Sequence, residues 1–508
     1  MKFKLWLITI LIVSCITAKG QLKYVDNDSA SFLKLMIVGD VTLTKEILNS
    51  SYSEKSKTYD FQHVFHYIRP ILNLGDIVIG NAGNSFGIDS NFLDGKTNNA
   101  PSEYGIALKY AGFNFLMNAN SAAVNQDIEP WLANKKYLDS LHINQIGSFE
   151  HDKDRRQRNP TLIKKDDITV AFLNYMDPLP YYTGVSPVVN GVQEDIIKKD
   201  ILRAINNGAE FIIVYLNWGN EYQSRENVNQ KNLADICLNA GADMVVGSGP
   251  NTVQNVSVSG EILANRVKKN IVLYSLGDFV STSTEPLFNS SCIIEIVLKK
   301  DKKTNTVEIE DDGFISTYTA MYEDGNKTRY AIMPVSQVEK SNINVPISAT
   351  EIHWMRSAAE KVRRKFSGAI DEIEYEINDE IIDDVAEVLT VTRRPLNESK
   401  NFRLEINNHL LSASNVEDNE EDIASEPIYN EGIIYKVQFL SLSREIPIDT
   451  EYYKHLRGYE TYKEGDYYHY VIGNFKNLKR ANDFCLDVKR NGHKYAYVVA
   501  FENGVKVK

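Results

Sequence analysis

Histidine and cysteine are the side chains most often used to bind transition metals or to attack a substrate, and in this sequence they stand in no pattern that suits such chemistry. His63 and His66 are three residues apart in a segment of helical spacing, on one helix face, without a carboxylate or cysteine set beside them. We predict ordinary, hydrogen-bonded surface histidines. Cys237, Cys292 and Cys485 are widely spaced among apolar neighbours and form no Cys-x-x-Cys pair, so we expect buried, unpaired thiols.

Short apolar runs separated by longer mixed segments predict the elements that carry any site in the first two thirds of the chain. Several runs follow a segment of helical period, which is typical of an α/β domain with buried strands. The predicted strands are Leu35–Val38, Ile77–Ile79, Phe113–Met117, Thr169–Leu173, Phe211–Leu216, Met244–Val246 and Ile271–Tyr274. The predicted helices between them include Val64–Leu72, Pro130–Leu141 and Asn229–Asn239.

The next part of the chain, residues 341–411, is predicted to be a helical appendage. Thr350–Phe366 has helical character, and Ala369–Leu389 carries isoleucines and a valine at spacings that mark one buried stripe of a helix. The polar and acidic stretch 412–430 is expected to be a flexible linker.

Composition and charge exclude some classes of function. Of the 508 residues 43% are hydrophobic, a globular balance, and the length favours several structural units. The net charge of −12 is concentrated in residues 371–387 and 415–426, which contain no Lys or Arg. It therefore says little about a binding site, and no basic stripe suggests nucleic acid.

The beginning of the sequence predicts export. A charged start, Met1–Lys4, precedes the apolar run Leu5–Val13, which is too short to span a bilayer. We favour residues 1–20 as a signal peptide and expect the protein in the periplasm or cell envelope. The alternative is a lipobox ending at Cys15, which would attach the protein to a membrane through a lipid.

Residues 33–340 resemble the CapA family, which is associated with poly-gamma-glutamate capsule synthesis and has a domain similar to calcineurin-type metallophosphatases. The resemblance implies an α+β sandwich. It rests on motifs in the family's order: Ile37–Asp40, Gly75–Asn81, Leu108–Phe113, Asn217–Tyr222, Ala240–Gly247 and Tyr274–Phe279.

Metallophosphatase chemistry needs Asp, Asn, His and Glu at strand ends to hold one or two cations, and the resemblance implies that most of these are missing here. Asp40 is kept, but Gly83 stands where the family has Glu. Ala122 and Asn217 each stand where the family has His, and the family's Gly-His-His-Pro-His is Gly247–Asn251 in this chain. We therefore expect no metal, no cofactor and no catalysis, in a domain whose fold is retained.

If the family geometry holds, a set of oxygen- and amide-bearing residues surrounds the same cleft. Such a pocket suits hydrogen bonding to a sugar or peptide, or weak binding of Ca²⁺ or Mg²⁺. The alternative is that these are turn and cap residues at strand ends. The set is Asp40, Asn81, Asn120, Asn217, Glu221, Asn251 and Asp278.

In residues 432–508 apolar and polar residues alternate in several short segments, a pattern that predicts a compact βαββαβ domain. Its segments Tyr435–Phe439 and Tyr468–Phe475 resemble the SPOR domain, which implies binding to peptidoglycan glycan strands. Alternation places Val437 and Phe439 on one face and Gln438 on the other, exposed face. The candidate glycan contacts are Gln438, Ser441, Tyr467 and His469.

Together these features predict an exported envelope protein in which a CapA-like domain without metal ligands binds an envelope polymer or protein and a SPOR-like module binds the wall. The alternative is an active capsule or wall-polymer enzyme with an atypical metal site. A third hypothesis is a structural wall-binding protein in which the large domain is a spacer.

Overall fold

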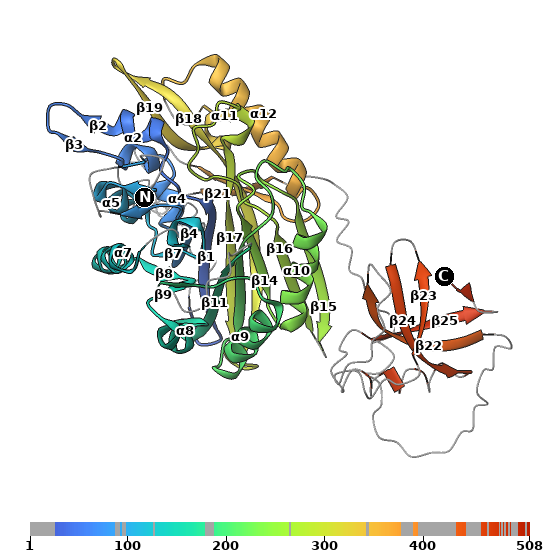
Figure 1. Cartoon of the computed structure of the whole chain (residues 1–508). Helices are drawn as coiled ribbons and strands as arrows, with labels where there is room; N and C mark the ends of the chain where they lie inside the picture. The colour runs from blue at the N-terminus through green and yellow to red at the C-terminus, as the bar shows by residue number, and fades with distance from the viewer. Residues whose placement is uncertain are drawn as a thin grey trace, which may run out of the picture. The chain divides into compact units, whose positions relative to one another are not determined.

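The computed structural model divides the chain into two compact units, residues 1–414 and 415–508, each described by itself below (Figure 1). The structure describes residues 26–507, except 87–91, 94–97, 125–126, 178–186, 264–265, 342–344, 377–389, 395–432, 443–458, 465–466, 503–504 and most of 477–495. The expected signal peptide, the lipobox at Cys15 and the acidic linker lie outside the described residues.

Two β-sheets form the centre of the first unit. The larger runs in the order β21-β20-β18-β17-β1-β4-β7-β8, with β19 paired to β18, and the smaller in the order β10-β11-β13-β14-β16-β15. The larger sheet consists of β1 (Ala30–Asp40), β4 (Ile77–Asn81), β7 (Phe115–Met117), β8 (Asn144–Ile146), β17 (Ser290–Asp301), β18 (Thr306–Asp324), β19 (Lys327–Pro334), β20 (Glu372–Glu376) and β21 (Thr390–Arg394). The smaller consists of β10 (Thr161–Lys165), β11 (Ile168–Met176), β13 (Phe211–Asn217), β14 (Met244–Ser248), β15 (Val256–Leu263) and β16 (Arg266–Leu273).

The seven predicted strands are confirmed, because each apolar run lies within or largely within a strand of these sheets. Side chains from both sheets, such as Ile37, Ile79, Phe172 and Ile213, pack together in one buried core between them. A sheet face covered by a second sheet explains why the strands carry apolar residues on both sides.

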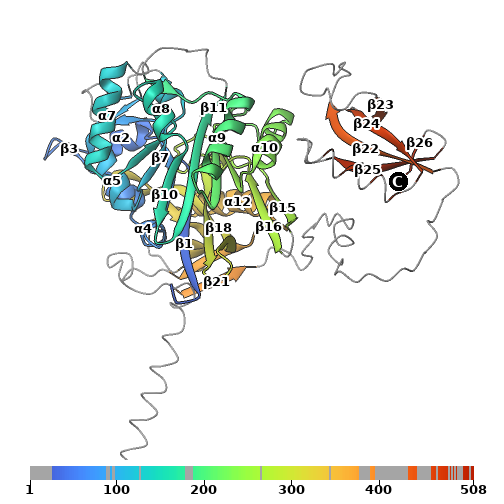
Figure 2. The same ribbon diagram turned by 90° about the horizontal axis from the view of Figure 1, so that it is seen from below.

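Helices cover the two outer faces of this sandwich (Figures 1 and 2). Their apolar faces supply buried residues to two further cores, one outside each sheet. Over the larger sheet lie α2 (Lys45–Ser51), α3 (Gln62–Phe65), α4 (Arg69–Leu72), α5 (Ser102–Ala111) and α7 (Ile128–Ser140); over the smaller lie α9 (Glu194–Asn206) and α10 (Val228–Ala240). The expected α/β class, an α+β sandwich, is thus observed.

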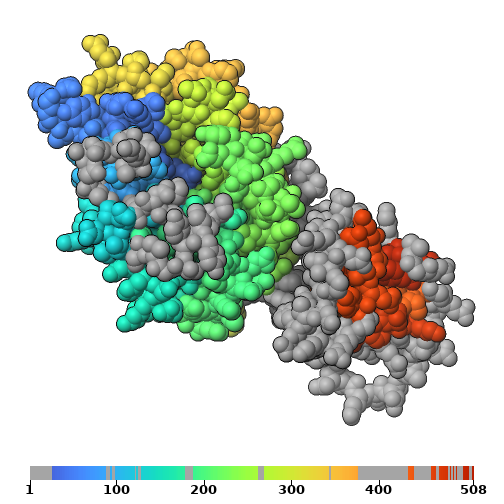
Figure 3. Space-filling view, viewed as in Figure 1, coloured from blue at the N-terminus to red at the C-terminus, as the bar shows by residue number. Residues whose placement is uncertain are grey.

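The remaining elements of the first unit are short or lie at its edges. They are β2 (Tyr52–Ser53), β3 (Thr58–Tyr59), β5 (Ser85–Phe86), β6 (Asn99–Ala100), α6 (Ser121–Val124), β9 (Ser148–Phe149), α8 (Asp152–Arg158), β12 (Val188–Val189), the 3-10 helix η2 (Pro286–Phe288), α11 (Val335–Glu339) and α12 (Ala349–Phe366). In space filling, the blue-to-cyan early part of the unit and its green later part meet along one face (Figure 3).

Parallel pairing brings the carboxyl ends of several strands to one edge. β1 and β4 are parallel with Asp40 opposite Asn81, and β13 and β14 are parallel with Asn217 opposite Ser248. Gly39 permits a further crossing, because a Cβ atom there would lie 1.8 Å from the carbonyl oxygen of Gly277. Asp40 forms a bridge with Asp278 at this point, so residues distant in sequence converge at one edge.

The expected helical appendage is only partly helical. α12 confirms the helix expected over Thr350–Phe366, but the helix expected over Ala369–Leu389 is wrong where the structure describes it, since Glu372–Glu376 is strand β20. Ile373 fits because the facing residue on β18 is Gly313, where a Cβ would lie 2.4 Å from the Ile373 side chain. Burial of Ile373 against Gly313 in the sheet thus outweighed the spacing of apolar residues that had predicted a helix.

The second unit contains one sheet of order β23-β24-β22-β25-β26. The strands are β22 (Ile433–Leu442), β23 (Glu460–Glu464), β24 (Tyr467–Phe475), β25 (Tyr497–Glu502) and β26 (Val505–Lys506). On one face Val437, Phe439 and Tyr470 pack against Cys485 and Val488. The helix expected over residues 450–457 lies outside the described residues.

None of the helices in the described ranges is long and apolar enough to cross a membrane. The cysteines Cys237, Cys292 and Cys485 are buried and free, as the sequence predicted.

Candidate functional site

A buried chain of polar side chains connects the ends of β1, β4 and β14. The amide nitrogen Nδ2 of Asn81 donates to Oδ1 of Asp40 at 2.5 Å and approaches Oγ of Ser248 at 3.2 Å. Asn120, from the loop after β7, donates through its own Nδ2 to Oδ1 of Asn81 at 3.2 Å and to the carbonyl oxygen of Ala82 at 2.7 Å. Three of the seven candidate residues are therefore in direct contact.

Asp40 and Asp278 form a carboxyl pair at the centre of this network. Burial raises the pKa of Asp40 to about 6, although hydrogen bonds from Asn81, the Gly249 N–H and Asp278 favour its charged form. Removal from water, together with the charges of Asp40 and Glu221, raises the pKa of Asp278 well above its usual value. Two carboxyls this close resist being charged together, so one proton is held between them with Asp278 as the donor.

The other three candidates lie around this centre with fewer connections. Asn217 ends β13, and its Oδ1 lies 2.9 Å from where a Cβ on Gly249 would stand. Glu221 is exposed and acts on Asp278 through its charge. Asn251 lies in a turn with a φ of 55°, a left-handed conformation that asparagine tolerates well.

Three of the positions where the family has an imidazole or a carboxylate are buried or closely packed. Ala122 is buried on the short helix α6, and its N–H donates to Oδ1 of Asn120. A Cβ on Gly83 would lie 2.2 Å from Oγ1 of Thr42. Gly249 has a φ of 105°, so a side chain would be strained there. Among the residues that the structure describes, no three His, Cys, Asp or Glu side chains are grouped so as to hold a metal ion.

Ser248 and Tyr215 are site residues that the sequence analysis missed. Ser248 is buried beside Asn81, and the ring of Tyr215 is buried beneath Asp40, with its hydroxyl 3.3 Å from the carbonyl oxygen of Val38. The Asp40 charge adds to burial in raising the pKa of Tyr215, so this hydroxyl stays protonated. Their position at the ends of β13 and β14 was the available signal, but neither residue belongs to the ligand types that were sought.

His63 and His66 are half-buried, so the prediction of surface histidines is wrong in that respect. Burial, reinforced by the positive charge of Arg329, lowers the pKa of His63 to about 4. The ring of His66 packs against Tyr67 at 5.1 Å. His63, on helix α3, lies near Arg329 of β19, a neighbour that the three-residue spacing alone did not indicate.

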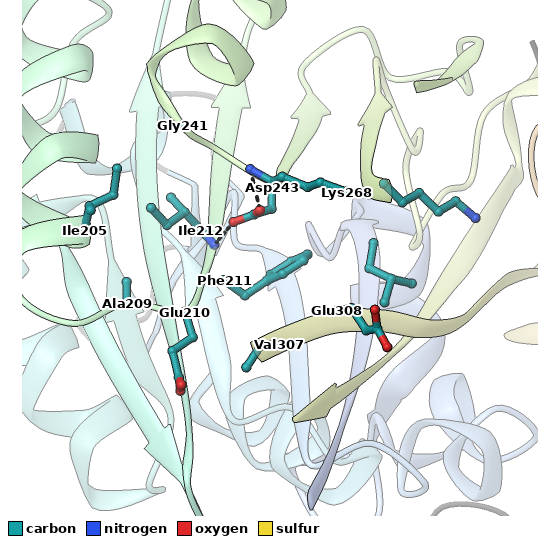
Figure 4. Close-up of a pocket in the computed structure, with 12 residues that line it drawn as sticks. Ile205, Ala209, Glu210, Phe211, Ile212, Gly241, Asp243, Lys268, Val307 and Glu308 are labelled. Carbon is teal, nitrogen blue, oxygen red and sulfur yellow. Dashed lines mark hydrogen bonds and ion pairs between the residues drawn. The ribbon is translucent and has the colours of Figure 1, made fainter. Parts of the chain in front are cut away.

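A separate pocket lies near the amino-terminal ends of β13 and β14, at the edge opposite Asp40 (Figure 4). Its lining includes Phe211, Ile212 and Asp243. Both carboxylate oxygens of Asp243 are engaged, one by Lys268 at 2.7 Å and the other by the N–H of Ile212 at 2.8 Å. These contacts hold the strands together and engage both oxygens of the Asp243 carboxylate.

In the second unit, the sheet face opposite the core carries a polar and aromatic cluster. Gln438 accepts a hydrogen bond from the Tyr462 hydroxyl at 2.6 Å and lies 3.1 Å from Nδ1 of His469. The rings of Tyr462 and His469 stack at 4.9 Å. Alternation placed Gln438 on this face correctly, but its predicted exposure is wrong, since only 3% of it reaches solvent.

The other glycan-contact candidates are less completely described. Ser441 lies opposite His469 in the β22–β24 register, and Tyr467 pairs with Glu464 at the start of β24. The side chains of Ser441 and Tyr467 lie outside the described residues. Tyr462 and Tyr497 are aromatic residues of this face that the sequence analysis did not select.

Comparison with known proteins finds a matching family and similar proteins from two Bacillus species. Residues 34–283 match the family described as bacterial capsule synthesis protein PGA_cap. The capsule biosynthesis protein CapA of Bacillus anthracis is 27% identical over 277 residues, which are 52% of this chain and 62% of that protein. The PGA biosynthesis protein CapA of Bacillus subtilis (strain 168) is 23% identical over 292 residues, covering 56% of this chain and 72% of that protein.

Solved structures with detectable likeness include a phosphatase from Mycoplasma pneumoniae, at 13% identity and a TM-score of 0.34, covering 56% of this chain and 93% of that one. The calcineurin-like phosphoesterase YfkN from Bacillus subtilis has 9% identity and a TM-score of 0.33, covering 66% of this chain and 97% of that one. This chain spans less than two thirds of the Bacillus anthracis relative. Residues 34–283 of this protein form a domain of the CapA-like bacterial capsule synthesis family PGA_cap.

Proposed function

We propose that this protein is a non-catalytic, exported cell-envelope protein whose CapA-like domain binds an envelope polymer or protein, while its second unit is a SPOR-like module that binds peptidoglycan glycan strands. The observation that carries the first part is the saturation of the polar network at the strand ends. Groups that would have to coordinate a cation are already engaged with one another.

Asn120 and Asn81 illustrate this saturation. The Asn120 amide donates to Asn81 and to the Ala82 carbonyl, and its Oδ1 accepts from the N–H groups of Ala122 and Ala123. The Asn81 amide uses its oxygen for Asn120 and its nitrogen for Asp40. Metal binding through either residue would break these hydrogen bonds in a buried place, which costs about 1–3 kcal/mol for each group left unsatisfied.

The alternative, an enzyme with an atypical cation, is favoured by the Asp40–Asp278 pair alone. A divalent cation would replace the proton held between the two carboxyls and would offset the repulsion by Asp40 that, together with burial, raises the pKa of Asp278. Two carboxylates without imidazole or further ligands favour a weakly held Ca²⁺ or Mg²⁺ over a transition metal.

Elemental analysis of the purified chain separates the two candidates. After mild purification without chelator we expect far less than one equivalent of Zn, Mn or Fe. Adding Mn²⁺ or Ca²⁺ should leave the melting temperature of the parent protein unchanged, and likewise that of Asp40→Asn. A stoichiometric metal, or a metal-dependent rise in the melting temperature that Asp40→Asn abolishes, would favour the enzyme.

The proposal for the second unit rests on the face that carries Gln438, Tyr462 and His469. Aromatic rings and amides together suit a sugar chain, because rings stack on its apolar faces and amides bond to its hydroxyls. Tyr497 on the same face is 42% exposed and is thus the ring with most contact surface to offer. The wall glycan is therefore the partner we assign to this unit.

Co-sedimentation of the whole chain with glycan stripped of its stem peptides tests this assignment. Tyr497→Ala should weaken pelleting about tenfold, because an exposed stacking ring is lost without core packing. The matched control is Glu502→Gln, on the same strand but on the alternate face, which should pellet like the parent protein. Equal pelleting of both variants, or none by the parent, would refute glycan binding by this face.

A further inference from the structure

Tyr222 has two properties that rarely occur together in a folded protein. Its φ is 59°, a left-handed conformation that is uncommon for a bulky side chain, and 54% of its surface is exposed. Strain of this kind costs on the order of 1–3 kcal/mol and persists only where surrounding contacts impose it. Less than half of the surface of Tyr222 is buried, so burial offsets only part of that cost and the fold leaves an aromatic residue largely open to solvent.

The contacts that impose this conformation also fix Tyr222 beside the candidate pocket. Its N–H donates to the carbonyl oxygen of Pro250 at 2.7 Å. Pro250 directly follows Gly249, whose N–H donates to the Asp40 carboxylate. On the other side, Tyr222 follows Glu221, whose charge acts on Asp278. The hydrogen bond to Pro250 and the chain link to Glu221 therefore place Tyr222 beside the Asp40–Asp278 pair.

Phe288 supports the ring from one side. The two ring centroids are 5.1 Å apart at an interplanar angle of 52°. The loop that carries Phe288 is held by Asn289, whose Oδ1 accepts from the Ser283 N–H at 2.7 Å and from the Ser281 hydroxyl at 2.8 Å. The two rings thus form a preorganised apolar surface near the buried carboxyl pair, which saves the entropy of ordering it on binding.

We propose that Tyr222 and Phe288 form a stacking platform for a sugar ring, and that the ligand of the CapA-like domain is an uncharged glycan. This inference rests on the proposed function, in which the pocket binds an envelope polymer, and it specifies the class of that polymer. A pyranose offers an apolar face for the platform and hydroxyl groups for the exposed polar side chains beside it, Asn220 and Glu221.

Charge decides between an uncharged glycan and a polyanion. The ionisable groups that form the carboxyl centre are Asp40, Asp278 and Glu221, all acidic, whereas the basic Lys365 donates to the carbonyl oxygen of Ser224, two residues beyond Tyr222. A polymer of repeating carboxylates or phosphates would meet like charges at the carboxyl centre, and it would gain little from stacking on the two rings because its chain has no ring face. A neutral sugar has neither disadvantage.

The test compares binding of a chitin oligosaccharide by the whole chain and by Tyr222→Asn, measured by isothermal titration. Asparagine suits the left-handed conformation, so this variant should keep or raise the melting temperature while it loses the ring. We expect affinity at the CapA-like domain to fall about tenfold, the effect of losing about 1.4 kcal/mol of stacking. Tyr222→Phe should retain it.

Two controls keep this test separate from the other assignments. Tyr497→Ala removes the exposed ring of the second unit, so titrations in that background report binding by the first unit. Poly-gamma-glutamate serves as the polyanionic probe and should not bind. Equal affinity of the parent and Tyr222→Asn for the sugar, no sugar binding in the Tyr497→Ala background, or binding of the polyanion instead would overturn the inference. The non-catalytic assignment is judged separately, by metal content.

Discussion

Replacing the buried Asp40 by asparagine should stabilise the first unit at neutral and alkaline pH. Because the pKa of Asp40 is raised from 3.8 to about 6, its ionisation in the folded protein is opposed by about two pKa units. At 1.36 kcal/mol per unit, that is at most about 3 kcal/mol of stability lost as the carboxyl ionises. Asp40→Asn keeps an oxygen for the Asn81 donor and offers an amide to Asp278.

The sign of the effect depends on pH. A carboxyl with a raised pKa contributes stability below its unfolded pKa, and this contribution is lost as the pH rises from about 4 through 6. Asp40→Asn should therefore be more stable than the parent by up to about 3 kcal/mol at pH 8, with little or no gain at pH 4.

Urea unfolding followed by tryptophan fluorescence is the suitable measurement. All four tryptophans precede residue 415, so the signal reports the first unit alone. Asp200→Asn is the matched control. Asp200 is equally buried but accepts from Arg155 at 2.6 Å, so the same substitution there should destabilise by a few kcal/mol. A gain at Asp40 that is the same at pH 4 and pH 8, or no gain at pH 8, would refute the reasoning.

Three further substitutions test other parts of the structure. As the pH falls from 6.5 to 4, the parent protein should lose up to about 3 kcal/mol of stability, because folding lowers the pKa of His63 to about 4. His63→Leu should not show this loss, which urea titrations of both proteins at the two pH values would measure. Arg363→Ala should cost about 3–5 kcal/mol because it takes a cation from the buried Glu372, whereas exposed Arg364→Ala should change stability by less than about 0.5 kcal/mol in the same urea assay. Val437→Asp should unfold the second unit by burying an unpaired charge, seen as rapid proteolysis confined to residues 415–508, and continued resistance would contradict the assigned core.

The strands were predictable because a strand buried on both faces leaves a continuous apolar run, as at Phe211–Leu216, whatever its partners are. The saturation of the candidate site was not predictable, since whether Asn120 is free or bonded depends on where Ala82 and Asn81 come to lie in space. The same limit applied to Gln438: alternation gave its face, but its burial comes from Tyr462 on another strand.

The hairpin of β20 and β21 is the last described structure of the first unit before the segment that leads to the second. Glu372 lies opposite Arg394, so a pull on the chain beyond Arg394 would act at the end of the hairpin where β20 begins. Tension of that kind separates the hydrogen-bonded residue pairs of the two strands one after another instead of all at once, and it would reach Glu372 first. Glu372 is bonded to Arg363 of α12 at 2.8 Å and pairs with Phe314 of β18, so a load applied beyond Arg394 would pass to both the helix and the large sheet.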